Sequence, residues 1–192
     1  MSDLMLTSQS PLSELKLDFG EVAVTELVSR AIVSIATPYG GGENLSKAVA
    51  SSLKTEIPAI GKSTMSNVGR ALLLGMQQDQ MFLLFDYSGN NAVDYLSQEI
   101  RDAGYLTDQS DSWVMISIFG PKARTTLQQT CSVDLHSAIF HNGAVIRTVM
   151  ANLSTIIVCE GENKFLVMSP RSSAKSFLKV LETSIRNSSQ GL

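Results

Sequence analysis

The chain consists mainly of apolar runs of strand length, each closed by polar or turn-forming residues. Residues 21–27 alternate between apolar and polar positions, and residues 30–36 form a second run rich in β-branched side chains. The segment Thr37 to Gly42 follows, with one proline and three glycines. Such runs, ended by turn residues, are typical of strands, so we predict strands at 21–27 and 30–36.

Helical spacing first appears after this loop. Leu45, Ala48 and Val49 lie on one stripe of a helix of roughly ten residues, for which Asn44 is the candidate N-cap. Pro58 excludes a continuation, because the residue before a proline is biased away from helical geometry.

The next segment predicts a loop and then a hairpin. Residues 57–69 are rich in Pro, Gly, Ser, Thr and Asn, which favours a loop. The apolar runs 70–76 and 81–86 flank the polar residues 77–80, so we expect a β-hairpin with a four-residue connection. Val93, Leu96 and Ile100 then predict a helix, with an asparagine cap at position 90 or 91 and Gly104 just past its end.

The second half repeats this order. Its predicted elements are a strand at 113–119, a short helix opened by Gly120-Pro121, a strand at 144–150, a hairpin formed by 155–159 and 164–168, and a last helix opened by Ser169-Pro170. Ala123 and Leu127 should face inward from the short helix, and Phe177, Leu178, Leu181 and Ile185 from the last one.

A shift of 83 residues sets Arg30 over Trp113 and superposes the two hairpins. We infer an α+β fold made of two pseudo-repeated β-α-β-β-α units with mixed or antiparallel sheets. Any two hairpin-and-helix segments can align by pattern alone, which leaves a chance match as the alternative. We expect an N-terminal arm at 1–20, docked through leucines, one domain at 21–186 with halves of about 21–104 and 105–186, and a fraying tail at 187–192.

Composition narrows the class of protein. Of 192 residues, 44% are hydrophobic and 17% are charged, with 15 basic against 18 acidic residues, which fits a globular protein. The basic residues are scattered singly, so we expect no nucleic-acid partner. The longest apolar runs are too short for a membrane span, and the first residues lack the features of a signal peptide, so the expected location is cytoplasmic.

The residues that could carry catalysis are few. His136 and His141 lack the spacing of a helical metal pair, and only Asp134 lies near them, so we expect no metal site. Cys131 lies close to His136 in sequence, but nucleophile and base meet through the fold, so this nearness is no evidence for a catalytic pair. Cys131 and Cys159 are interpreted as small buried hydrophobes.

Three other features of the sequence bear on a possible site. The glycines at 40–42 precede a helix, where backbone N–H groups can bind phosphate, but no complete phosphate-binding motif is present. Arg147 interrupts the apolar run 144–150, so it is either solvated, buried against a carboxylate, or part of an interface. Trp113, the only tryptophan, is expected in the core or at an interface. We assign no catalytic, cofactor-binding or metal residue, and name Arg147, His136, Asp134 and Trp113 as candidate interface residues or buried charges.

Several segments of the chain form a recognisable set over about residues 65–186. The most specific are Cys131-Ser-Val-Asp-Leu-His136 and Arg147-Thr148, and the others are the run from Gly120-Pro121 to Leu127 and the two hairpins. In these segments the chain resembles the gamma subunit of heterotetrameric sarcosine oxidase. The sequence departs from that pattern at Met76-Gln77-Gln78 and at His141-Asn142, where a proline is common. These departures leave room for another N-methyl amino acid as the substrate of the complex.

The resemblance implies a fold like that of the glycine cleavage T protein, a folate-binding aminomethyltransferase. It implies a non-catalytic chain in a four-chain flavoenzyme that oxidatively demethylates sarcosine to glycine, with folate-linked one-carbon release. Alpha, beta and delta subunits would be the partners, and they would hold FAD, FMN, NAD, tetrahydrofolate and zinc, with no cofactor in this chain. The alternative is a free-standing folate-binding or aminomethyltransferase-like protein.

Overall fold

The computed structural model describes residues 9–68 and 70–189, whose strands form two sheets with antiparallel pairing throughout. Sheet A contains, in spatial order, β1 (Lys16–Asp18), β2 (Ala23–Glu26), β8 (Trp113–Phe119), β11 (Lys164–Pro170), β10 (Leu153–Gly161) and β9 (Val145–Met150). Sheet B contains β4 (Ser63–Met65), β5 (Leu72–Gln77), β6 (Gln80–Asp86), β3 (Arg30–Ala36) and β7 (Tyr105–Asp108). The expected α+β class is confirmed.

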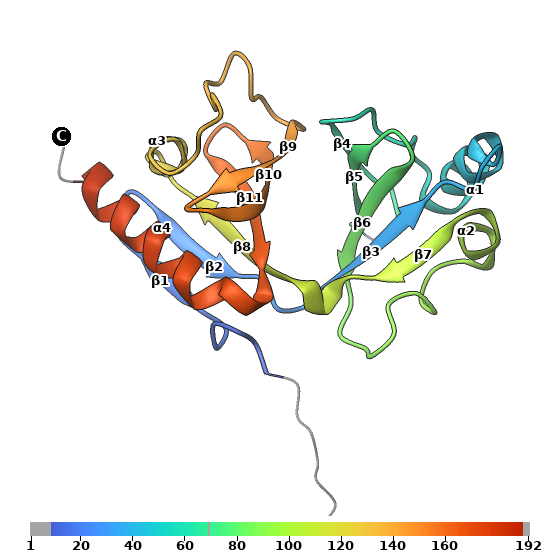
Figure 1. The fold of residues 1–192 in the computed structure, drawn as a ribbon, viewed down its shortest axis with the longest axis horizontal. Coiled ribbons are helices and arrows are strands. Elements are labelled where there is room, and N and C mark those ends of the chain that lie inside the picture. The colour runs from blue at the N-terminus through green and yellow to red at the C-terminus, as the bar shows by residue number, and fades with distance from the viewer. Residues whose placement is uncertain (1–8, 69, 190–192) are drawn as a thin grey trace, which may run out of the picture.

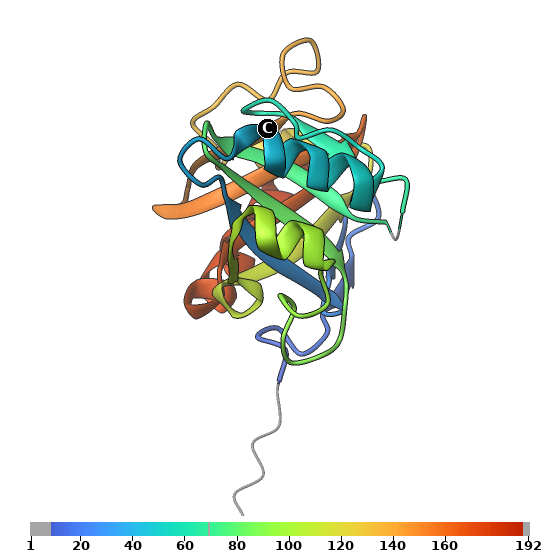
Figure 2. The same cartoon turned by 90° about the vertical axis from the view of Figure 1, so that its right-hand side faces the viewer.

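Helices cover the outer face of each sheet (Figure 1). The α-helices are α1 (Gly42–Leu53), α2 (Gln98–Ala103), α3 (Ala123–Gln128) and α4 (Ala174–Ser189), and the 3-10 helices are η1 (Ser110–Ser112) and η2 (Arg171–Ser173). Figure 2 shows α1 and α2 together on the outside of sheet B. The layers therefore run from α3 and α4 through sheet A and sheet B to α1 and α2.

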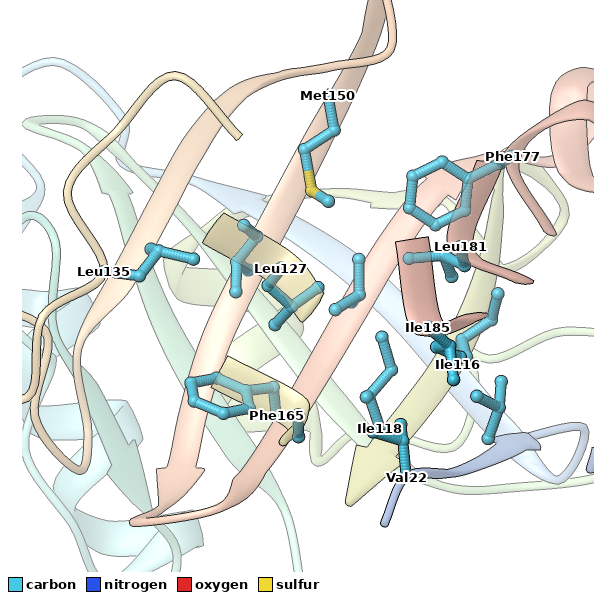
Figure 3. Packing of buried hydrophobic residues seen from close by; sticks show 14 of the residues in the cluster. Val22, Ile116, Ile118, Leu127, Leu135, Met150, Phe165, Phe177, Leu181 and Ile185 are labelled. Atoms are coloured by element: carbon cyan, nitrogen blue, oxygen red, sulfur yellow. The ribbon is translucent and has the colours of Figure 1, made fainter. Parts of the chain in front are cut away.

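Three apolar clusters hold these layers together, because successive side chains of a strand point to opposite faces. Phe177, Leu181 and Ile185 of α4 are fully buried over the outer face of sheet A, in one cluster with Ile116 and Ile118 of β8 (Figure 3). A second cluster lies between sheet B and its helices. The inter-sheet core comprises Ile32, Leu72, Leu74, Phe82, Leu84, Trp113, Met115, Val145, Ile156, Val158, Leu166 and Met168. It joins the two sheets face to face.

The predicted duplication is present, and its first unit contains one strand, β4, that was not expected. At the shift of 83 residues, β3 falls on β8, and the short strand β4 falls on β9. Residues 57–69, expected to be a loop, therefore include a strand, because residues 63–65 pair with β5. Serine, threonine and exposed Met65 give those three residues no apolar run from which to predict it.

The two units exchange their first strands. β2 falls close to β7 at the same shift, yet β2 pairs with β8 of the second unit and β7 pairs with β3 of the first. The halves expected at about 21–104 and 105–186 thus mark the repeats in sequence, while each sheet takes one strand from the other half. We propose that 21–186 is one domain, since neither sheet is complete within its own half.

The N-terminal segment docks as its leucines suggested. Leu12 is buried and Leu15 and Leu17 pack against the outer core of sheet A, with β1 extending the sheet beyond β2. Residues 1–8 of the expected arm lie outside the described residues. The tail expected from residue 187 is instead helical through Ser189, and residues 190–192 lie outside the described residues.

Helix starts and turn lengths differ from the sequence predictions. α1 begins at Gly42 with Gly41 as N-cap, so Asn44 lies inside its first turn. α2 begins only at Gln98, where the Ser97 side chain caps it by accepting from the backbone N–H of Ile100. Both hairpins are tighter than predicted, with two residues between their strands instead of four, because the strands continue into the polar residues.

Candidate functional site

The structure brings together two of the four residues singled out from sequence. The guanidinium carbon of Arg147 on β9 lies 5.8 Å from the ring centroid of Trp113, the first residue of β8. This distance is within the range of a cation–π contact. The indole also packs edge-on against Phe82 of sheet B, with 6.3 Å between ring centroids. Trp113 therefore connects Arg147 to the inter-sheet core.

Arg147 is exposed although it lies in a strand. Strand register sets Arg147 opposite Ile156 of β10, which belongs to the inter-sheet core, so both residues occupy the inner face of sheet A. The Nε of Arg147 donates to the Ser154 hydroxyl at 3.2 Å. Arg147 takes part in none of the ion pairs between the residues that the structure describes. Burial against a carboxylate is thus excluded within this part of the chain.

Asp134 and His136 lie together in the loop between α3 and β9, and both are exposed. One carboxylate oxygen of Asp134 accepts from the backbone N–H of His136 at 2.8 Å, and Nδ1 of His136 accepts from the N–H of Ala138 at 3.3 Å. These contacts are local turn-forming hydrogen bonds. The Asp-Leu-His pattern therefore stabilises the conformation of this loop, and neither hydrogen bond involves Arg147.

The loop between α3 and β9 approaches the loop that precedes β4 of sheet B. Nε2 of His141 lies 3.4 Å from Nζ of Lys62, and residues 62 and 144 form an antiparallel bridge. The backbone N–H of Val145 donates to the carbonyl of Gly61 at 2.9 Å. These backbone contacts join the ends of the two sheets next to β9. Ile60 and Ile139 are exposed on the two loops, at 61% and 63%, which is uncommon for large apolar side chains.

Arg124 of α3 anchors the 131–144 loop, a role that was not predicted. Its guanidinium donates to the carbonyls of Leu135, of Phe140 at 3.0 Å and of Glu162 at 3.1 Å. It also lies over the Phe165 ring at 4.9 Å. The Gly120-Pro121-Lys-Ala-Arg pattern contained this residue, but only the fold shows which carbonyls it meets.

A second set of charges missed by sequence reasoning lies between the sheets. Arg30 of β3 is within 3.5 Å of Asp86 and 3.9 Å of Glu160 on β10, and Lys164 lies 3.1 Å from Glu160. The side chains of Arg30 and Glu160 are only 18% and 15% exposed. The sequence signal that could have predicted this cluster is the charged residue at or near the end of each of these apolar strands. The ion pair between Arg30 and Glu160 joins β3 of sheet B to β10 of sheet A.

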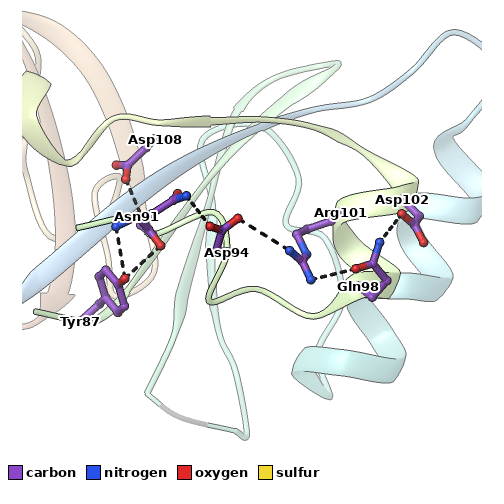
Figure 4. A network of polar contacts seen from close by, with 8 residues as sticks. Tyr87, Asn91, Asp94, Gln98, Arg101, Asp102 and Asp108 are labelled. Carbon is purple, nitrogen blue, oxygen red and sulfur yellow. Dashed lines mark hydrogen bonds and ion pairs between the residues drawn. The ribbon is translucent and has the colours of Figure 1, made fainter. Parts of the chain in front are cut away.

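A polar network holds the segment between β6 and α2 (Figure 4). The Tyr87 hydroxyl contacts the backbone of Asn91, and Asp94 links Asn91 to Arg101. Burial alone would raise the pKa of Asp108, but hydrogen bonds from Ser110 and the backbone of Ala92 outweigh it and hold that pKa below its usual value. The segment around residue 93, predicted to be helical, instead forms turns that these side-chain contacts hold in place.

A second carboxylate with a shifted pKa joins the two outer helices. The Glu99 carboxylate accepts from the Ser52 hydroxyl at 2.7 Å and from the Ser51 hydroxyl at 2.9 Å. The bond from Ser52, followed by that from Ser51, lowers the pKa of Glu99. The arrangement ties α1 to α2 on the surface.

Trp113 lines a cleft of about 440 Å³. Glu26, Arg30, Asp108, Trp113 and Arg171 are among its lining residues. Glu26 is already bonded to the Ser10 hydroxyl and to the backbone N–H groups of two leucines, so the N-terminal segment occupies that carboxylate. Within residues 9–68 and 70–189, no three His, Cys, Asp or Glu side chains gather as a metal site.

No helix in the described part of the chain is long and apolar enough to span a membrane. Cys159 is buried as expected, and its thiol donates to the Gly161 carbonyl at 3.2 Å. Cys131 is only partly buried, because it lies where the loop after α3 forms a bridge with Met150. The expectation that both cysteines are buried is therefore wrong for Cys131.

Comparison with solved structures defines the class of fold first. The aminomethyltransferase T of the glycine cleavage system from Bartonella henselae superposes with a TM-score of 0.60 and 14% identity, covering 81% of this chain and 44% of that one. The chain therefore has the aminomethyltransferase-like fold that the family resemblance implied, over less than half of the larger protein. No protein-family model matches the chain.

The particular resemblance is to sarcosine oxidase. A chain of the heterotetrameric sarcosine oxidase from Corynebacterium sp. U-96, solved in complex with pyrrole 2-carboxylate, superposes with a TM-score of 0.79 and 21% identity, covering 95% of this chain and 96% of that one. The curated gamma subunit from Corynebacterium sp. strain U-96 is 26% identical over 180 residues, 90% of this chain and 87% of the relative. That from strain P-1 is 24% identical over 156 residues, 80% and 74% of the two chains. The resemblance inferred from residues 65–186 is thereby confirmed.

Proposed function

We propose that this chain is the non-catalytic gamma subunit of a heterotetrameric flavoenzyme that oxidatively demethylates sarcosine or a related N-methyl amino acid. The observation that carries the proposal is the match to curated sarcosine oxidase gamma subunits along 78–90% of the chain. The match spans both repeats, so it concerns the whole architecture and not one shared hairpin.

Surface composition supports a role within a larger assembly. Four large apolar side chains are more than half exposed on neighbouring segments. Ile60 and Ile139 lie on the two adjoining loops, Met65 lies on β4 and Val149 lies on β9. Large exposed apolar side chains grouped on neighbouring segments mark protein interfaces. We assign this region to contacts with the other subunits.

The partners in the proposal are alpha, beta and delta subunits that hold FAD, FMN, NAD, tetrahydrofolate and zinc. Sarcosine would be converted to glycine in those subunits, with the one-carbon unit passed to tetrahydrofolate. The proposal places the complex in the cytoplasm. It assigns no bond-making step to the chain described here.

Affinity purification of the tagged chain from its native organism tests the proposal. We expect three co-purifying chains, a flavin absorption spectrum in the eluate, and hydrogen peroxide production when sarcosine is added. A screen of other N-methyl amino acids then identifies the preferred substrate. A colourless protein that purifies alone would refute the proposal.

A thermal-shift titration with tetrahydrofolate gives the complementary test. A ligand that binds the native state raises the melting temperature by mass action. A clear rise for the solitary chain would indicate the free-standing folate-binding protein instead. The gamma-subunit proposal predicts no shift for the isolated chain.

A further inference from the structure

Arg147 combines three properties that seldom occur together at a solvated position. It is exposed, it is held in place by two side chains, and none of the ion pairs among the described residues includes it. The Trp113 ring lies 5.8 Å from the guanidinium carbon, and the Ser154 hydroxyl accepts from Nε. A long side chain normally loses rotamer freedom when it binds a partner. Here part of that cost is already met within the chain.

Among the described residues, the terminal nitrogens of the guanidinium donate no hydrogen bond, whereas Nε donates to Ser154. A guanidinium offers a planar pair of donors that matches the two oxygens of a carboxylate. The contact with the Trp113 ring and the hydrogen bond from Nε leave the terminal nitrogens available to a partner. The geometry therefore suits a carboxylate that approaches exposed Arg147 from solvent, on the inner face of sheet A.

The surroundings decide which kind of anion fits. Arg147 is the only basic residue on β9 and β10, so no second cation is available on these strands for a polyanion. Val149, on the same face of β9 and 54% exposed, supplies an apolar neighbour. A single cation beside an aliphatic side chain matches one acidic residue of a folded protein surface better than a phosphate-rich ligand.

We infer that Arg147, supported by Trp113 and Ser154, is a docking point for an aspartate or glutamate side chain of another subunit, with Val149 as its apolar neighbour. The inference rests on the proposed function, because that function supplies the partner chain. It adds the surface and the chemistry of the contact. Arg147 also lies beside the loop junction that carries exposed Ile60 and Ile139, so the docking point is continuous with the proposed interface.

The test uses the assembled complex, purified through a tag on one of the larger chains. Variants Arg147→Ala and Arg147→Lys are compared with Arg186→Ala, which removes an exposed arginine from α4. The retained fraction of the small chain is measured by size-exclusion chromatography across a KCl series and across dilution. We expect Arg147→Ala to weaken retention roughly tenfold or more, with Arg147→Lys intermediate and Arg186→Ala like wild type.

Two substitutions at Val149 test charge without removing Arg147 or its contact with Trp113. Val149→Asp places a competing carboxylate beside Arg147 and should weaken retention as Arg147→Ala does. Val149→Lys adds positive charge at the same exposed position and should retain the small chain about as well as wild type does. Equal losses for the two variants would show that only shape matters, and would overturn the inference.

The outcomes separate the two claims. If the wild-type chain does not assemble with larger flavin-bearing chains, the proposed function fails and the docking inference falls with it. If wild type assembles and Arg147→Ala and Val149→Asp are retained at the same KCl concentrations as Arg186→Ala, only the docking inference is refuted. Should Arg147→Ala fail to fold, the opposite charges at Val149 decide the matter alone.

Discussion

Replacing Arg124 with methionine should destabilise the protein and release the 131–144 loop. Methionine keeps an apolar side chain of similar length, so packing beside Phe165 is largely preserved while the charge and its donors are lost. The variant removes the hydrogen bonds to the carbonyls of Leu135, Phe140 and Glu162. It thus isolates the anchoring function of the guanidinium.

The magnitude follows from the number of bonds and the exposure of the site. A hydrogen bond from a charged donor contributes about 1.5–3 kcal/mol, and a buried carbonyl left unpaired carries a cost of its own. Arg124 is partly exposed, so water can replace some of the lost bonds. Bonds that share one donor group are also not additive. We therefore expect a loss of about 3 kcal/mol in the free energy of unfolding, a large part of the roughly 5–15 kcal/mol typical of a domain.

Urea unfolding of the purified chain measures this loss, and hydrogen exchange locates it. The amide of Phe140, which donates to the His136 carbonyl at 2.8 Å, should exchange faster in the variant. Arg186→Met on α4 is the matched control and should stay within about 0.5 kcal/mol of wild type. If Arg124→Met also stays within that range and the Phe140 amide keeps its protection, the anchoring role of Arg124 is refuted.

Four further substitutions test other parts of the fold. Gly120→Ala should lower the free energy of unfolding by more than about 3 kcal/mol, because Gly120 has φ of +135° and an added Cβ would lie 2.2 Å from a backbone oxygen. Gly20→Ala, at φ of +81° with open space around it, should lower it by only about 1 kcal/mol. Thermal unfolding compares the two variants. Phe177→Ala should lose about 3–5 kcal/mol in denaturant titrations, because that side chain is fully buried under α4. The carboxylate of Asp108 stabilises the fold above its ordinary pKa of about 4 and loses this effect as the pH falls through the lowered native pKa. Asp108→Asn should therefore lower stability at neutral pH by about 1 kcal/mol and flatten the loss of stability on acidification, as followed by circular dichroism.

Two strands with a dense apolar run were predicted to the residue. The strands at 30–36 and 113–119 have the predicted ends, because buried side chains on both faces leave no ambiguity about their extent. Helix α2 was misjudged because Val93 and Leu96 do pack against the core, but from turns that precede the helix. An apolar periodicity of three or four residues is compatible with successive turns as well as with a helix.

The candidate site was predictable in its residue types but not in its contacts. Arg147 stood out because a charge interrupts an apolar strand, and Trp113 because it is the only tryptophan. Their meeting depends on the order β8-β11-β10-β9, in which two strands separate them. The ion pair between Arg30 and Glu160 depends on the packing of one sheet on the other. Sequence spacing carries no information on either arrangement.

The exchange of first strands explains why these contacts form within a single body. Without the other half, β8 would lose its neighbour β2 and β3 would lose β7, leaving the backbone groups of a central strand unpaired. Trp113 begins β8 where η1 carries the chain from sheet B to sheet A, and its ring contacts Phe82 on one sheet and Arg147 on the other. The position of Arg147 is therefore set by both repeats. A subunit that binds there would contact a surface whose geometry depends on the complete, strand-exchanged fold.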